Sequence, residues 1–214
     1  MEKSVRAAIM KHMLLNELIT NRQHGLVAGK SCTMQLSTCI DEWTNILDKE
    51  GSLDTLYLDL MKAFDEVPHK RLLKKRVKKR VVLNGIKSAW SPLTSGIPQG
   101  SVLVPTLFLV FINDLPEVVR AVIQMFSDDS KAFKEIASPS DANDLQTDLG
   151  SMESWTQTWQ LRFNDTKCKV MHIGARNPKS DYTLRGNVTL EKTTCEKDLG
   201  CILKKQATSS TVTS

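Results

Sequence analysis

The residues of this chain best suited to chemistry are three aspartates in apolar surroundings. Asp59 ends a strongly apolar run, and Asp128 and Asp129 lie together between two further apolar runs. A carboxylate buried beside a sheet costs several kcal/mol unless it is paired or binds a metal ion. Carboxylates from neighbouring strands form a site for hard divalent cations, and Mg²⁺ accepts one or two of them together with substrate phosphates.

Two interpretations of these aspartates stand side by side. Two divalent ions about 3.5–4 Å apart can activate an attacking 3′ oxygen and stabilise a leaving pyrophosphate in an in-line displacement. Turns, however, are rich in Asp, so an isolated Asp128–Asp129 pair is more typical of an ordinary turn than of a metal site. The residues around the pair must decide between the two.

Short apolar runs predict the strands that would hold the aspartates. Four such runs are rich in strand formers: residues 55–60, 121–125, 132–136 and 168–173. The middle two flank the polar residues 126–131 in the pattern of a hairpin. Further small hairpins are expected over residues 81–86, where Asn-Gly supplies the positive φ angles of a tight turn, and over residues 182–190.

Helical periodicity predicts the elements that cover the sheet. The expected helices span residues 3–19 and 36–47, follow Pro68, carry Leu107 to Ile112, and run from a cap at Ser140 to Trp159. Because helices are mixed with strands and hairpins, the fold class is α+β with a mainly antiparallel sheet rather than a doubly wound fold.

The positive charge of the chain is concentrated in one block. The 214 residues include 29 Lys and Arg against 24 Asp and Glu, a net charge of +5. Eight of the eleven residues 70–80 are basic and none is acidic. The block could bind phosphates, direct nuclear import or form a solvated helix face, and these alternatives stay open.

Composition and cysteine usage indicate a location inside the cell. The five cysteines form no CxxC pair, which argues against a zinc site and favours a reducing compartment. Charges interrupt the N-terminal residues, so no signal peptide is expected, and the most apolar stretch, residues 102–112, is too short to cross a bilayer. We therefore expect an intracellular protein, nuclear or cytoplasmic and not secreted, without contact to a membrane.

One segment imitates a phosphate-binding loop. Residues 25–31 (GLVAGKS) resemble a Walker A motif but have three residues between the glycines where four are needed, and no strand precedes them. We expect the segment instead to lie on the fingers side, near a template or nucleotide.

Six ordered blocks together resemble the reverse transcriptases of jockey-like non-LTR retrotransposons. The blocks are residues 23–32, 57–69 (YLDLMKAFDEVPH), 95–108 (SGIPQGSVLVPTLF), 126–131 (FSDDSK), 159–174 and 196–203. They cover nearly all of residues 3–203, and their order makes the match specific.

The resemblance implies a function, its cofactors and its partners. Members of this family are RNA-directed DNA polymerases, which add deoxynucleoside triphosphates to a DNA primer on an RNA template with two Mg²⁺ or Mn²⁺ ions. Asp59, Asp128 and Asp129 match the metal-binding, catalytic aspartates of the family. The alternative from another class is a catalytically inactive retroelement remnant that acts at most as a nucleic-acid or protein binding module.

The resemblance also implies substrate-binding residues. Phe64 would lie under the incoming sugar and exclude a ribose 2′-hydroxyl, although it could be plain core. Gln99 would touch the nucleotide and the template, and Gly100 would let the backbone approach the nucleic acid closely, although both could simply form a turn. Lys167 would contact the triphosphate or protonate pyrophosphate.

The implied fold is the palm of a right-hand polymerase, an antiparallel sheet with helices, plus partial fingers and with the thumb largely absent. Residues 1–50 would be partial fingers, 51–174 the palm with the three polymerase motifs, 175–203 a hairpin at the junction of palm and thumb, and 204–214 a disordered tail. Relative to the family, the chain is truncated, and the connection near residues 70–80 is shortened by roughly twenty residues, which leaves it far shorter than the additional helix of the family needs.

Overall fold

The computed structural model describes residues 2–61 and 103–204 in full, and between them only the backbone pairing of four two-residue strands. Those strands are β2 (Lys78–Lys79), β3 (Val82–Leu83), β4 (Ile86–Lys87) and β5 (Ser91–Pro92). β3 pairs antiparallel with β4, as expected for the hairpin predicted over residues 81–86, and β2 pairs with β5. The helix expected after Pro68 and the tail at 205–214 lie outside the described residues.

The centre of the fold is a five-stranded sheet in the order β11-β8-β1-β7-β6. Its strands are β1 (Leu53–Asp59), β6 (Val122–Phe126), β7 (Asp129–Glu135), β8 (Lys169–Ile173) and β11 (Glu191–Thr193). Every neighbouring pair is antiparallel except β11 and β8. The expected α+β class with a mainly antiparallel sheet is therefore confirmed.

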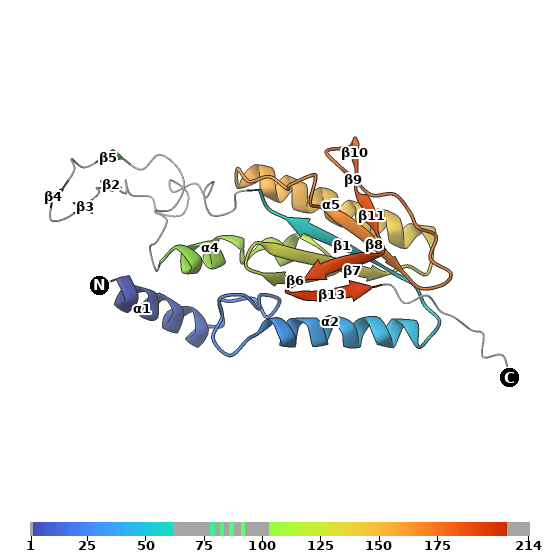
Figure 1. Cartoon of the computed structure of the whole chain (residues 1–214), viewed down its shortest axis with the longest axis horizontal. Helices are drawn as coiled ribbons and strands as arrows, with labels where there is room; N and C mark the ends of the chain where they lie inside the picture. Colours follow the sequence, from blue (N-terminus) through green and yellow to red (C-terminus); the bar gives the residue numbers. More distant parts are fainter. Residues whose placement is uncertain are drawn as a thin grey trace.

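Helices lie on both faces of this sheet (Figure 1). They are α1 (Glu2–Leu15), α2 (Cys32–Leu47), α4 (Val104–Ile112), the 3-10 helix η1 (Leu115–Val118) and α5 (Pro139–Thr158). Two small hairpins complete the described chain: β9 (Thr183–Leu184) with β10 (Val188–Thr189), and β12 (Cys195–Asp198) with β13 (Cys201–Lys204).

The two faces of the sheet bury different cores. On one face, Leu56 and Leu58 of β1 pack with Phe111 of α4 and with Leu145 and Leu149 of α5. On the other, Leu53 and Phe133 pack with Cys39 and Trp43 of α2 and with Met171 of β8. Because successive strand residues point to opposite faces, β1 contributes apolar side chains to both cores.

Two predicted helix boundaries were wrong. α1 ends at Leu15 rather than at residue 19, because Glu17 takes a positive φ of 53° that a right-handed helix cannot continue. α5 is capped by Ser138 rather than Ser140, because Pro139 is well suited to the first helical position. The Asp141 carboxylate closes this cap by accepting from the Ser138 backbone N–H at 2.8 Å.

In the loop that resembles a Walker A motif, the side chains of Lys30 and Ser31 contact backbone groups of the protein itself. The Lys30 ammonium donates to the backbone carbonyls of Asn21 (2.8 Å) and Gln23 (2.9 Å), and Ser31 caps α2 by accepting from the Met34 N–H at 3.2 Å. Both residues that would serve a phosphate in a Walker A loop therefore have structural partners here.

Candidate active site

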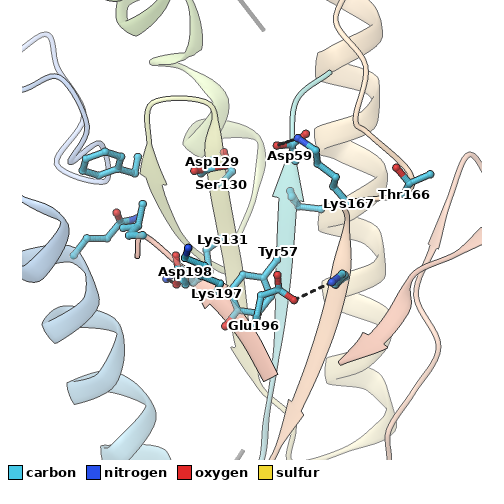
Figure 2. Close-up of a pocket in the computed structure, with 15 residues that line it drawn as sticks. Tyr57, Asp59, Asp129, Ser130, Lys131, Thr166, Lys167, Glu196, Lys197 and Asp198 are labelled. Atoms are coloured by element: carbon cyan, nitrogen blue, oxygen red, sulfur yellow. Dashed lines mark hydrogen bonds and ion pairs between the residues drawn. The ribbon is translucent and has the colours of Figure 1, made fainter. Parts of the chain in front are cut away.

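The fold brings Asp59 and Asp129 together at one end of the central sheet. They are direct cross-strand partners in the antiparallel pair of β1 and β7. In such a pair the Cβ atoms lie about 4.5–5.5 Å apart. Figure 2 shows both carboxylates at the same end of the two neighbouring strands.

A tight turn places Asp129. Phe126 pairs with Asp129 across the β6–β7 hairpin, so only Ser127 and Asp128 lie between the strands. The prediction of a longer polar tip over residues 126–131 was wrong, because Ser130 and Lys131 belong to β7 and pair with β1. Ser127 has a positive φ of 61°, which is usual for glycine and uncommon for other residues.

Lys167 lies beside Asp59 although the two residues are far apart in sequence. The chain before β8 runs along the end of β1, where the Asn164 N–H donates to the Asp59 carbonyl at 2.8 Å. From this segment the Lys167 ammonium reaches the Asp59 carboxylate at 3.3 Å. The Lys167 side chain is 63% exposed and that of Asp59 only 22%, so the lysine covers the carboxylate from the solvent side.

The surroundings of Asp129 disfavour the ionised form of its carboxyl group. Partial burial of the Asp129 carboxyl, followed by the charges of Asp128, Asp59 and Asp198, raises the pKa of Asp129 from 3.8 to about 6, against the opposite effect of Lys167. A cation placed between the carboxylates would relieve this repulsion.

An open cavity of about 250 Å³ lies in front of the two aspartates. Its walls come from β1, β7, β12 and the segment leading to β8, and Gln35 of α2 also contributes (Figure 2). Tyr57 and Lys131 lie two residues from Asp59 and Asp129 on the same strands, so the period of two puts all four on one face of the sheet.

Two ion pairs fix the hairpin β12–β13 as a wall of this cavity. Lys131 forms an ion pair with Asp198, and their side chains are only 4% and 8% exposed. Lys169 pairs with Glu196 at 3.3 Å. Sequence reasoning gave these residues no role. Strand alternation after Asp129 could have placed Lys131 on the site's face, but no local signal connects it to Asp198.

Not every predicted site residue belongs to the described part of the chain. Phe64, Gln99 and Gly100 lie outside the described residues, as does most of the basic block 70–80. Asp128 occupies the turn next to Asp129 and is not among the described residues that line the cavity.

The donor set fits a divalent cation whose coordination substrate completes. Within residues 2–61 and 103–204, no group of three or more His, Cys, Asp or Glu side chains is gathered as a preformed metal site. Asp59 and Asp129 are cross-strand partners at the open cavity, whereas its other two carboxylates, Glu196 and Asp198, pair with Lys169 and Lys131. Partial burial, followed by the neighbouring carboxylates, raises the pKa of Asp129. One or two carboxylates plus phosphates are what Mg²⁺ accepts, so these residues fit that ion.

Comparison with known proteins decides the family. Residues 1–206 match the family described as reverse transcriptase (RNA-dependent DNA polymerase). The chain belongs to this family. The resemblance found from the six sequence blocks is thereby confirmed, and the likeness extends across both cores and the candidate site of this reverse transcriptase chain.

Relatives among curated proteins come from mobile elements. The RNA-directed DNA polymerase from mobile element jockey of Drosophila melanogaster is 28% identical over 196 residues, covering 75% of this chain and 21% of that protein. Its counterpart in Drosophila funebris is 26% identical over 238 residues, covering 96% and 26%. The probable RNA-directed DNA polymerase from transposon X-element of D. melanogaster is 24% identical, covering 97% and 25%.

These alignments also bear on length. The reverse transcriptase chain spans only 21% to 26% of these relatives. The D. funebris alignment, at 238 positions, is longer than this 214-residue chain, so that relative carries residues within the matched stretch that this chain lacks.

A solved structure supports the fold. The structure of apo telomerase from Candida tropicalis, truncated from its C-terminal domain, matches with a TM-score of 0.50 at 10% identity and covers 95% of this chain and 44% of that chain. At this identity the likeness concerns the fold alone, and it confirms the expected right-hand polymerase class. In the described part of the reverse transcriptase chain, none of the helices is long and apolar enough to span a bilayer.

Proposed function

We propose that this chain is the polymerase part of an RNA-directed DNA polymerase that adds deoxynucleotides to the 3′ end of a DNA primer on an RNA template. The observation that carries the proposal is the pairing of Asp59 with Asp129 at one open cavity, in a chain of the reverse transcriptase family. In this proposal residues 51–174 act as palm, 1–50 as partial fingers and 175–203 as the hairpin toward a thumb.

Asp59, Asp128 and Asp129 would hold two Mg²⁺ or Mn²⁺ ions. When bound, the ions would supply activation of the attacking 3′ oxygen and stabilisation of the leaving pyrophosphate. The aspartates orient this chemistry, because Asp59 and Asp129 come from strands whose register is fixed by the two cores. The tight turn at Ser127 and Asp128 keeps the third carboxylate next to them.

Lys167 is proposed to serve the triphosphate. Its ammonium lies 3.3 Å from the Asp59 carboxylate and is mostly exposed, so it can turn to an incoming phosphate once a cation neutralises Asp59. An ammonium at this position would balance charge on the phosphates and donate a proton to pyrophosphate. The family resemblance supports further substrate contacts by Phe64, Gln99 and Gly100, and a site of action inside the cell.

Primer extension on a homopolymer RNA template with Mg²⁺ or Mn²⁺ tests this function. We expect extension by the wild type and a loss of about 1,000-fold or more in Asp59→Asn and in Asp129→Asn, because each removes a carboxylate that holds the ions. Asp181→Asn is the matched control, since Asp181 is exposed and forms an ion pair with the exposed Lys192.

The same assay decides against the alternative from another class. If neither the wild type nor the Asp129→Asn variant extends the primer, the polymerase proposal is contradicted. That result would favour an inactive remnant that binds nucleic acid. For that remnant, a steep fall of RNA affinity with salt concentration would indicate contacts to several phosphates. Extension that survives in Asp129→Asn would contradict the assignment of the site.

A further inference from the structure

A loop distant from the aspartates in sequence is built against the turn that carries them. Residues 22–25 add a short parallel bridge beside β6, in which Gln23 pairs with Met125. The Met125 N–H donates to the Arg22 carbonyl and the His24 N–H donates to the Met125 carbonyl, both at 2.9 Å. The loop therefore extends the sheet beyond its edge strand β6, which belongs to the β6–β7 hairpin.

The Gln23 side chain links the backbone of this loop to the backbone of the β6–β7 turn. Its amide oxygen Oε1 accepts from the Gly25 N–H at 2.8 Å and from the Ser127 N–H at 3.1 Å. Gln23 is fully buried, so no water competes for these bonds. Ser127 is the residue with the positive φ of 61°, and one hydrogen bond from a buried side chain thus acts directly on the strained residue of the turn.

Close packing at Gly25 leaves the turn no room to move toward the loop. A Cβ atom at Gly25 would lie 2.4 Å from the Ser127 nitrogen and 2.9 Å from the Phe126 carbonyl carbon. Backbone therefore touches backbone here, and only glycine allows that distance. The imidazole of His24 adds a side-chain bond, Nε2 to the Gln124 Oε1 at 3.1 Å.

We propose that Gln23 is a positioning residue for the polymerase site: through the Ser127 N–H it holds the turn in the conformation that directs Asp129 toward Asp59. This inference rests on the proposed function. Ser127 precedes Asp128 and Asp129, so a rotation at Ser127 would displace the Asp128 carboxylate in the turn and the Asp129 carboxylate at the start of β7. Displacements of about 1 Å at a reacting centre change rates by roughly 100-fold.

Gln23→Met tests the proposal, because methionine has a similar length and lacks the acceptor. We expect hydrogen exchange of the Ser127 amide to become about 10-fold faster. We also expect Mn²⁺ to bind more weakly, and the maximal rate of single-nucleotide addition to fall by about 10- to 100-fold with little change in the KM for the nucleotide.

Gln146→Met is the matched control. The Gln146 amide also bridges a backbone, donating to the Thr183 carbonyl at 3.0 Å and accepting from the Thr183 N–H at 2.9 Å. We expect a comparable change in melting temperature but unchanged exchange at Ser127, Mn²⁺ affinity and turnover. A second matched pair is Gly25→Ala, expected to behave like Gln23→Met, and Gly150→Ala, where an added Cβ would meet no described residue within 4 Å outside its own stretch of helix.

The outcomes separate this inference from the proposed function. Unchanged exchange at Ser127 in Gln23→Met, or equal loss of turnover in Gln146→Met, would overturn the positioning role. A wild type that extends no primer would overturn the polymerase proposal, whereas exchange at Ser127 and the Mn²⁺ titration would still decide whether Gln23 holds the turn and its carboxylates.

Discussion

At the scale of single residues, Asp129 links pH to stability. Its pKa is raised from 3.8 to about 6 by partial burial and by neighbouring carboxylates. A group whose pKa is raised by folding contributes stability that is fully present below its unfolded pKa and is lost as the pH rises through its folded pKa. The contribution of Asp129 is therefore lost between pH 3.8 and about 6.

We expect Asp129→Asn to stabilise the protein at pH 7 by about 1 kcal/mol, a value reduced for solvent screening, and to give no gain near pH 3. Melting temperatures of both proteins across this range, in the absence of divalent cations, measure the effect. An equal gain at both ends of the range would contradict the electrostatic origin. Added Mg²⁺ should reverse the order at pH 7, since only the wild type keeps the carboxylate.

At the scale of elements, the hairpin β12–β13 depends on a buried ion pair. Breaking such a pair by removing one partner leaves an uncompensated charge and costs about 3–5 kcal/mol, whereas replacing both partners by apolar residues is often neutral. We expect Lys131→Met to destabilise by this amount and the double variant with Asp198→Leu to recover most of it.

Urea unfolding of the two single variants and the double variant measures the coupling between Lys131 and Asp198. The matched control is the surface pair Arg176–Glu50, whose side chains are 77% and 76% exposed. Its disruption should change the free energy of unfolding by no more than about 1 kcal/mol. Additive losses in the double variant would show that the buried pair does not anchor the hairpin.

The elements were more predictable than their pairing. Apolar alternation and periodicity located β1, the β6–β7 hairpin, α2 and β8 within a few residues, because these patterns follow from one face being buried. Ser130 and Lys131 were predicted as loop since they are weak strand formers, and pairing with β1 overrides that preference. The register of Asp59 with Asp129, and the ion pair to Asp198, depend on contacts between distant segments that no local pattern records.

At the scale of the whole molecule, a buried polar cluster anchors the chain that follows β8 to the central sheet. Asp54 is fully buried and its carboxylate accepts from His172 Nδ1 (2.6 Å), Asn177 Nδ2 (2.7 Å) and the Tyr182 hydroxyl (2.6 Å). His172 lies in β8, and Asn177 and Tyr182 lie in the segment between β8 and β11. The hairpin β12–β13, which lines the cavity, follows directly after β11.

The two tyrosines of the chain offer a matched test of this cluster. Tyr182→Phe should lower the free energy of unfolding by about 1.5–3 kcal/mol, because it leaves an oxygen of the buried Asp54 carboxylate without a donor. Tyr57→Phe should cause no loss, since the buried Tyr57 hydroxyl has no hydrogen-bond partner among the described residues. Chemical denaturation compares the two, and equal losses would contradict a special role for the cluster.

The central position of β1 in the sheet affects how the protein folds while it is being synthesised. Both of its neighbours, β7 and β8, come much later in the chain, whereas β6 and β7 form a local hairpin. During synthesis β1 therefore emerges from the ribosome with no strand to pair with, and long-range pairings of this kind fold slowly. An apolar strand left open for that time is the part of a nascent chain most prone to aggregate, so the yield of this protein should depend on chaperones that cover β1 until its partners are translated.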